Sequence, residues 1–182
     1  MCKNMDEIEP QYVPILLLLE ATGFRLVDIL NLKQDALIEI AGEYWVRSER
    51  ANLRYQYVMV PIRKELAELI KENTKKVQEK FSSENPENFM FLRYSGAKGI
   101  GKPFLQLSVL RSLDRFAERV NIIDESGRRF HFKATAFKHR FGLKIMKAGL
   151  NMAQVHQLIA NVTSEMPMIY VRKILKESLQ NE

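Results

Sequence analysis

A strongly apolar segment near the start of the chain most constrains its fold. Residues 10–21 show no period-2 alternation, so they predict a buried helix rather than a strand. Gly23 is a natural stop for this helix. The longest purely apolar run, residues 15–19, is far too short to span a bilayer, so we expect no membrane segment. The other elements must cover this helix, and 182 residues are enough for one domain with a real core.

The remaining sequence predicts a mainly α-helical domain with one small sheet, an α+β fold. β-Branched and aromatic residues predict three short antiparallel strands, at 36–40, 44–50 and 55–62. A turn at Ala41 and Gly42 joins the first two. Apolar periodicity and capping residues predict further helices, at 25–32, 63–81, 105–120, 134–148, 152–159 and 164–179. Residues 82–102 are loop-rich apart from a short apolar segment at 89–92. We find no internal repeat, so we expect a single domain over residues 1–182.

The basic charge of the chain is concentrated in one region. Lys and Arg number 28 against 22 Asp and Glu, a net charge of +6. Residues 126–164 contain no Asp or Glu but seven basic residues: Arg128, Arg129, Lys133, Lys138, Arg140, Lys144 and Lys147. A basic segment with acidic flanks is typical of phosphate binding. A solvated helix face that is basic by composition explains the charge equally well.

Cysteine and histidine are scarce. The single cysteine, Cys2, excludes a disulfide framework and a Cys-rich zinc site, and three His argue against a His-rich metal site. We therefore expect no metal and no cofactor. The N-terminus is polar and acidic, with no visible signal peptide, which favours a soluble cytoplasmic protein.

Three segments carry more specific patterns. Residues 22–32 read T-G-x-R-x-x-D-x-x-x-L after the apolar helix, and the predicted sheet ends in Val60-Pro61-Ile62. The third segment, residues 130–171, holds four short blocks in order: A-F-K-H-R-F-G at 136–142, A-G-L-N at 148–151, Q-L-I-A-N at 157–161 and I-Y at 169–170. Together they resemble the catalytic domain of the tyrosine recombinases, which include phage-type integrases and transposon recombinases. The resemblance covers nearly the whole chain.

The resemblance implies a metal-free phosphoryl transfer on double-stranded DNA. A tyrosine hydroxyl attacks a phosphodiester, forms a 3′-phosphotyrosine and releases a 5′-hydroxyl, and a partner strand later reverses the step. Tyr170 stands at the position of the nucleophile and Arg25 at that of a phosphate-binding arginine. Asp28 and His139 take supporting positions. From the residues alone, Arg25 is also a helix-end arginine that pairs with Asp28 at i+3, and Tyr170 a partly buried tyrosine on the last helix.

Several catalytic positions depart from the family pattern. Where the family has His and then Arg three residues later, this chain has Thr135 and Lys138. The helical spacing places Lys138 on the opposite side of the core stripe (137, 141, 145 and 148) from the basic stripe at Lys133, Arg140, Lys144 and Lys147. That position suits a phosphate-facing lysine, although a lysine snorkelling at the core edge also fits. Lys lacks the bidentate fork of Arg, so transition-state stabilisation should be weaker.

Two further positions are substituted. Asn161 replaces the usual His or Trp; it can donate a hydrogen bond but cannot act in acid–base chemistry. The family lysine on the hairpin, which protonates the leaving oxygen, is missing, since residues 44–61 contain no Lys. Arg54 lies nearest the expected place and is a poor proton donor. We expect Arg47 and Arg50 to contact DNA, together with the basic stripe.

These substitutions leave three hypotheses open. The chain is a working but divergent recombinase for DNA integration or recombination, a DNA-binding remnant with impaired cleavage, or a non-enzymatic helical regulator that binds nucleic acid. Family members carry an N-terminal domain that clamps the DNA, and we expect that domain to be absent from this chain. They also act as tetramers on DNA and exchange a C-terminal segment, for which residues 171–182 are the candidate.

Overall fold

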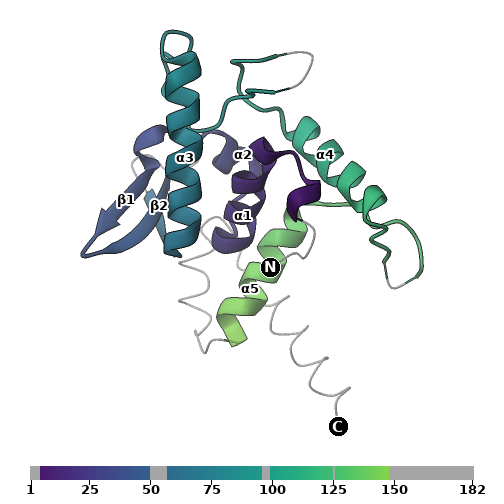
Figure 1. Ribbon diagram of the computed structural model, residues 1–182. Coiled ribbons are helices and arrows are strands. Elements are labelled where there is room, and N and C mark those ends of the chain that lie inside the picture. Colours follow the sequence, from purple (N-terminus) through teal and green to yellow (C-terminus); the bar gives the residue numbers. More distant parts are fainter. Residues whose placement is uncertain (1–4, 50–56, 96–98, 125, 148–182) are drawn as a thin grey trace.

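The computed structural model describes residues 5–49, 57–95, 99–124 and 126–147 (Figure 1). Helix α1 (Val13–Thr22) lies in the middle, with a three-stranded sheet and α3 (Lys64–Phe81) on one side, α4 (Gln106–Arg119) on the other and α5 (Ala134–Lys147) below. The mainly helical fold with one small antiparallel sheet is confirmed. The predicted helices at 152–159 and 164–179 lie outside the described residues. Within the described part of the chain, no helix is long and apolar enough to cross a membrane.

Helix α1 is buried on nearly every side, as its apolar sequence predicts. Ile15, Leu18 and Leu19 are fully buried. A short 3-10 turn, Pro10–Tyr12, leads into the helix. The helix ends at Gly23, whose φ of +64° lies in the left-handed region and whose N–H donates to Leu19 O at 3.2 Å. The predicted stop is confirmed, and the chain leaves α1 in a fixed direction.

The sheet has the order β1-β2-β3, with both pairs antiparallel. The strands are β1 (Leu37–Ile40), β2 (Glu43–Glu49) and β3 (Tyr57–Ile62). Ala41 and Gly42 form the first turn with φ of 52° and 82°, as a type I′ hairpin turn requires. Val46 and Val60 lie opposite each other and are both buried, so they seat the sheet on the core. β1 begins one residue later than predicted because Ala36 belongs to the 3-10 turn Gln34–Ala36.

The other described helices confirm the predicted segments with small shifts in their bounds. Helix α2 (Leu26–Leu30) is shorter than the predicted 25–32, because Arg25 has an extended backbone (ψ 147°) and stands at its N-cap. The predicted apolar segment at 89–92 is confirmed, since Met90, Phe91 and Leu92 are almost fully buried. Isolated bridges pair this segment with residues 33 and 103. The loop region is therefore part of the core.

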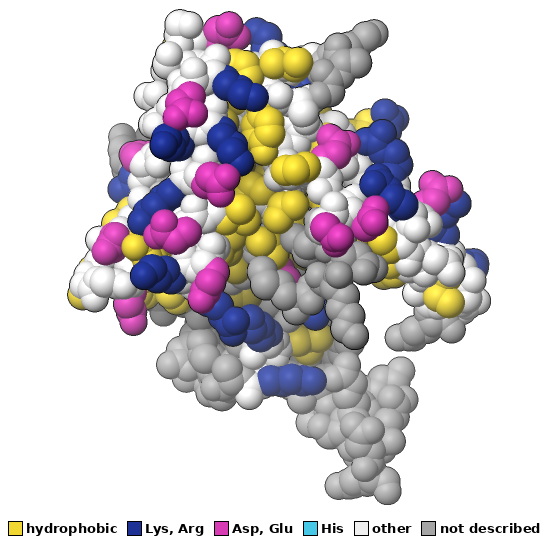
Figure 2. Space-filling view, in the orientation of Figure 1, with side chains coloured by type: hydrophobic (Ala, Val, Ile, Leu, Met, Phe, Trp, Pro, Cys, Tyr) yellow, Lys and Arg dark blue, Asp and Glu magenta, His cyan; other side chains and the backbone are white. Residues whose placement is uncertain are grey.

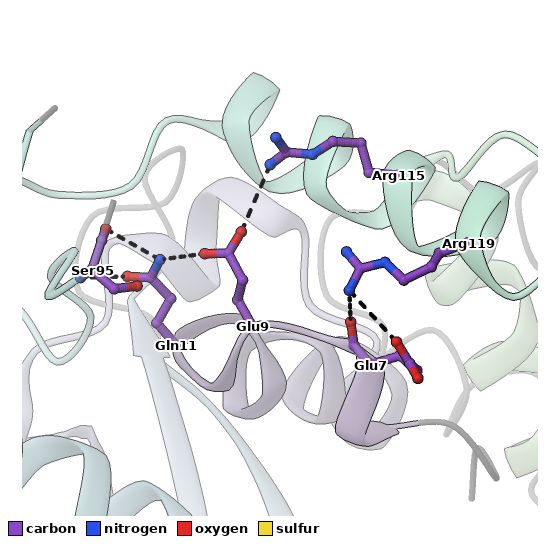
Figure 3. A network of polar contacts seen from close by, with 6 residues as sticks. All are labelled: Glu7, Glu9, Gln11, Ser95, Arg115 and Arg119. Atoms are coloured by element: carbon purple, nitrogen blue, oxygen red, sulfur yellow. Dashed lines mark hydrogen bonds and ion pairs between the residues drawn. The ribbon is translucent and has the colours of Figure 1, made fainter. Parts of the chain in front are cut away.

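Exposed ion pairs connect the N-terminal residues to α4 (Figure 3). Arg119 donates to the backbone oxygen of Glu7 at 3.0 Å and lies 3.6 Å from its carboxylate. Arg115 lies 3.8 Å from the carboxylate of Glu9. The amide of Gln11 continues the network to the backbone of Ser95. The network fixes the chain just before the 3-10 turn that leads into α1.

We expect the double substitution Glu7→Gln and Glu9→Gln to change stability little. Both pairs are solvent-exposed, and such pairs contribute about 0–1 kcal/mol each. Urea unfolding of the variant should give a loss of at most about 2 kcal/mol, which shrinks further in 0.5 M salt. A loss above about 3 kcal/mol, insensitive to salt, would contradict this and assign the N-terminal residues a core role.

Candidate active site

Arg25 is held rigidly at the start of α2. Its Nε donates to Asp28 Oδ2 at 2.8 Å and its Nη2 donates to Asp28 Oδ1 at 3.1 Å, so the pair is bidentate. This hydrogen bonding raises the pKa of Arg25. The Arg25 side chain remains 37% exposed, and among the described residues its Nη1 makes no hydrogen bond. The i+3 pairing predicted from sequence is therefore confirmed, and it leaves one edge of the guanidinium for an anion.

Lys138 differs from the other basic residues of α5. It is half-buried, whereas Arg140, Lys144 and Lys147 on the same helix, and Lys133 just before it, are exposed. Burial lowers the pKa of Lys138, and the positive charge of Arg25 lowers it further, while the carboxylate of Asp28 acts in the opposite direction. Arg25 and Lys138, 113 positions apart in the sequence, thus act on each other electrostatically. Two cations close enough to influence each other in this way make the region favourable for an anion.

Two aromatic anchors dock α5 so that Lys138 reaches this site. Phe141 is buried against Gly23; a Cβ added to that glycine would lie 2.7 Å from Phe141 Cγ. One turn earlier, the ring of Phe137 stacks on Phe132 at 6.0 Å. The core stripe predicted for α5 is confirmed at Phe137 and Phe141, and its other positions lie outside the described side chains. Lys138 stands between the two anchors, and Gly23 stands two residues before Arg25.

The surface of α5 carries positive charge only. Figure 2 shows acidic and basic side chains mixed over α3 on the upper left, and basic side chains without acidic ones over the described part of α5 at the bottom. Arg140 lies 4.0 Å from Glu20 at the end of α1 and stays 79% exposed. The described basic stripe is therefore open to solvent beside the site.

The other predicted site residues lie on α5, on the sheet or outside the described residues. Thr135 is exposed and His139 half-buried, both within one turn of Lys138 on α5. Arg47 pairs with Asp35 at 3.1 Å and lines, together with Asp28, a cavity of about 310 Å³. Four predicted site residues lie outside the described residues: Arg50, Arg54, Asn161 and Tyr170. Among the described residues, no group of His, Cys, Asp or Glu is arranged to hold a metal ion.

Sequence reasoning missed one element of the site, the contact between Gly23 and Phe141. It identified Gly23 only as a helix stop and Phe141 only as a core residue. The signal available was a glycine immediately before the phosphate-binding motif, where a close approach of another element excludes any side chain. The partner of that glycine could not be predicted from the sequence.

Comparison with known proteins decides the family. The model of the phage integrase family matches residues 1–177. The chain belongs to the phage integrase family. The resemblance inferred from the three motifs is thereby confirmed.

Curated relatives of this integrase-family chain are transposases. Transposase B of transposon Tn554 from Staphylococcus aureus strain N315 is 29% identical over 181 residues, which are 98% of this chain and 27% of the relative. Transposase B of transposon PsiTn554 from the same species is 28% identical over the same shares. The chain thus spans about a quarter of the length of the curated relatives it matches.

Solved structures share the fold. The XerH site-specific recombinase bound to its difH substrate has a TM-score of 0.73 at 17% identity, over 97% of this chain and 49% of that one. The XerA recombinase has a TM-score of 0.69 at 12% identity, over 98% and 64%. The Tn1549 transposon integrase with transposon right end DNA has a TM-score of 0.62 at 17% identity, over 87% and 53%. The predicted tyrosine-recombinase catalytic fold is confirmed.

Proposed function

We propose that this chain is the catalytic domain of a tyrosine recombinase that cuts and rejoins double-stranded DNA for a mobile element, using Tyr170 as nucleophile. The observation that carries the proposal is the convergence of Arg25, braced by Asp28, with Lys138 from a distant helix. Membership of the phage integrase family and the similarity to transposases support it. The same membership favours a recombinase over a regulator of other origin.

The proposed step is a phosphoryl transfer with tyrosine as the acceptor. Tyr170 Oη forms a bond to phosphorus, its proton passes to solvent, and the bond from phosphorus to the 5′ oxygen breaks. The products are a 3′-phosphotyrosine and a free 5′-hydroxyl, and a 5′-hydroxyl of a partner strand reverses the step. The phosphorane carries extra negative charge, which Arg25 and Lys138 stabilise from two sides.

The remaining predicted residues assist this step in the proposal. Asn161 donates a hydrogen bond to a phosphate oxygen, and Thr135 and His139 support the α5 side of the site. Arg54 adds positive charge from the hairpin side. Other cations hold the DNA backbone: Arg47, Arg50, Lys133, Arg140, Lys144 and Lys147. Because these contacts are to phosphates, DNA binding should weaken steeply as salt rises.

The wider setting is part of the same proposal. We infer that the chain acts inside the cell on the DNA of the nucleoid, as a tetramer that joins two sites and exchanges residues 171–182 between neighbours.

The test is covalent capture on a suicide substrate. The full chain is incubated with nicked duplexes of randomised sequence, in which the short strand carrying the 5′-hydroxyl diffuses away after cleavage and traps the phosphotyrosine. Wild type should give a protein–DNA adduct that survives denaturation, and Tyr170→Phe should abolish it without weakening binding. Equal adduct from both proteins would place the nucleophile elsewhere. Binding without any adduct would make the chain a DNA-binding remnant and overturn the proposed activity.

A further inference from the structure

The leaving group poses a problem that Arg25, Arg54 and Asn161 do not solve. As the bond to phosphorus breaks, the 5′ oxygen takes the electron pair and must receive a proton, because an alkoxide is a poor leaving group in neutral water. The hairpin offers no lysine, since residues 44–61 contain none. Arg25 and Arg54 keep their protons at any ordinary pH, and the amide of Asn161 is not an acid. A proton donor has to come from another element.

We propose that Lys138 is the general acid of this site and donates a proton from Nζ to the leaving 5′ oxygen. The proposal rests on the proposed function and assigns Lys138 a second role besides its charge. An arginine at this position could stabilise the phosphorane but could not act as the acid. The Lys that stands in place of the family Arg lacks the bidentate fork but supplies the missing proton donor.

The docking of α5 places Lys138 where such a donor is needed. Phe141 fixes the helix against Gly23, two residues before Arg25, and Lys138 lies one turn before Phe141. The guanidinium of Arg25 is fixed by its two hydrogen bonds to Asp28. A phosphate bound by Arg25 would therefore lie next to the Lys138 ammonium. Lys144 and Lys147 on the helix, and Lys133 just before it, are exposed instead.

The surroundings of Lys138 suit proton donation. Partial burial and the charge of Arg25 both lower its pKa, so that it releases a proton more readily than an exposed lysine. Asp28 is the acidic group that opposes this shift, and it is engaged by Arg25. Both Arg25 and Asp28 belong to the start of α2. The same short segment therefore binds the phosphate and shifts the pKa of Lys138.

The proton balance closes over the two half-reactions. In cleavage, Tyr170 Oη bonds to phosphorus, the electron pair of the broken bond moves to the 5′ oxygen, and Lys138 gives that oxygen a proton and becomes a neutral amine. In rejoining, the neutral amine removes the proton from the incoming 5′-hydroxyl as that oxygen attacks phosphorus. Lys138 is then an ammonium again, and the Tyr170 oxygen released in rejoining takes back from solvent the proton that it lost in cleavage.

A sulfur-substituted substrate tests this role. In duplexes whose 5′ bridging oxygen is replaced by sulfur, the leaving thiolate needs no proton, because a thiol has a pKa of about 8.5. On the oxygen substrate, Lys138→Arg and Lys138→Ala should both slow adduct formation by about 100-fold or more. On the sulfur substrate, Lys138→Arg should return to within about tenfold of wild type, because it keeps the charge and no longer needs to act as the acid. Lys75→Arg, on the exposed face of α3, is the matched control and should behave as wild type on both substrates.

Two outcomes would overturn the assignment. Lys138→Arg could match wild type on the oxygen substrate, which would make Lys138 only a charge. It could also remain slow on the sulfur substrate, which would make the loss structural or electrostatic. If instead wild type forms no adduct on either substrate, the proposed function itself fails. Tyr170→Phe separates the two cases, since it should abolish the adduct on both substrates whatever Lys138 does.

Discussion

Gly23→Ala is expected to destabilise the protein by about 3 kcal/mol. The left-handed backbone at φ +64° costs a non-glycine residue about 1 kcal/mol or more. In addition, the new methyl group would lie within 3 Å of three atoms of Phe141 in the core, and such overpacking costs about 1–3 kcal/mol. Urea unfolding, followed by circular dichroism, measures the loss.

Gly42→Ala is the matched control for this prediction. Gly42 has a φ of +82°, but nothing lies within 4 Å of an added Cβ, so its cost should be the backbone cost of about 1 kcal/mol alone. Equal losses at Gly23 and Gly42 would contradict the role given to Phe141. In a Phe141→Ala background the Cγ and Cδ1 contacts are removed and only Cβ remains near the new methyl group, so the cost of Gly23→Ala should fall toward that of Gly42→Ala.

Gly23→Ala should also slow catalysis. If α5 moves away from α1 to make room for the methyl group, Lys138 moves relative to Arg25. A displacement of about 1 Å in a positioned group can cost about 100-fold in rate. Adduct formation on the suicide substrate, at a temperature where Gly23→Ala is still folded, should fall accordingly, whereas Gly42→Ala should keep the wild-type rate.

Arg25→Ala is expected to give the largest loss of activity that leaves the fold intact. Removal of one fixed donor to a transition-state oxyanion costs about 100- to 1000-fold. Arg25 offers a full charge as well, so the rate of adduct formation should fall by about 1000-fold or more. Single-turnover cleavage of the suicide substrate measures the rate, and the thermal unfolding midpoint checks that the variant is folded.

Two further variants of the Arg25–Asp28 pair separate the effect of its bidentate geometry from the effect of its charge. Arg25→Lys keeps the charge but cannot form the bidentate pair, so it should recover only a small part of the lost rate. Asp28→Asn keeps one acceptor and loses the charge, so the guanidinium is held less firmly and the rate should fall by a smaller factor than in Arg25→Ala. Full activity of Arg25→Ala would remove this arginine from the site.

Local patterns explain why the elements could be predicted well. The apolar helix, the Gly23 stop and the Ala41-Gly42 turn each depend on residues close in sequence, and each is confirmed. The Arg25–Asp28 pair was predictable for the same reason, because residues at i and i+3 face each other on a helix. Element bounds were less accurate. Helix α2 begins one residue later than predicted because the backbone of Arg25 is extended, and apolar periodicity does not reveal backbone angles.

The sequence by itself determined the type and order of the elements, the family motifs and the separation of Lys138 from the basic stripe, since all of these follow from residue spacing. Only the tertiary structure decided that Lys138 acts on Arg25, that Phe141 packs against Gly23 and that Arg47 pairs with Asp35. Local sequence does not state which distant side chain fills the space beside a glycine, because that depends on how whole helices pack to bury apolar surface. The candidate site exists where α5 docks on the end of α1, two elements that are more than 100 residues apart in the chain.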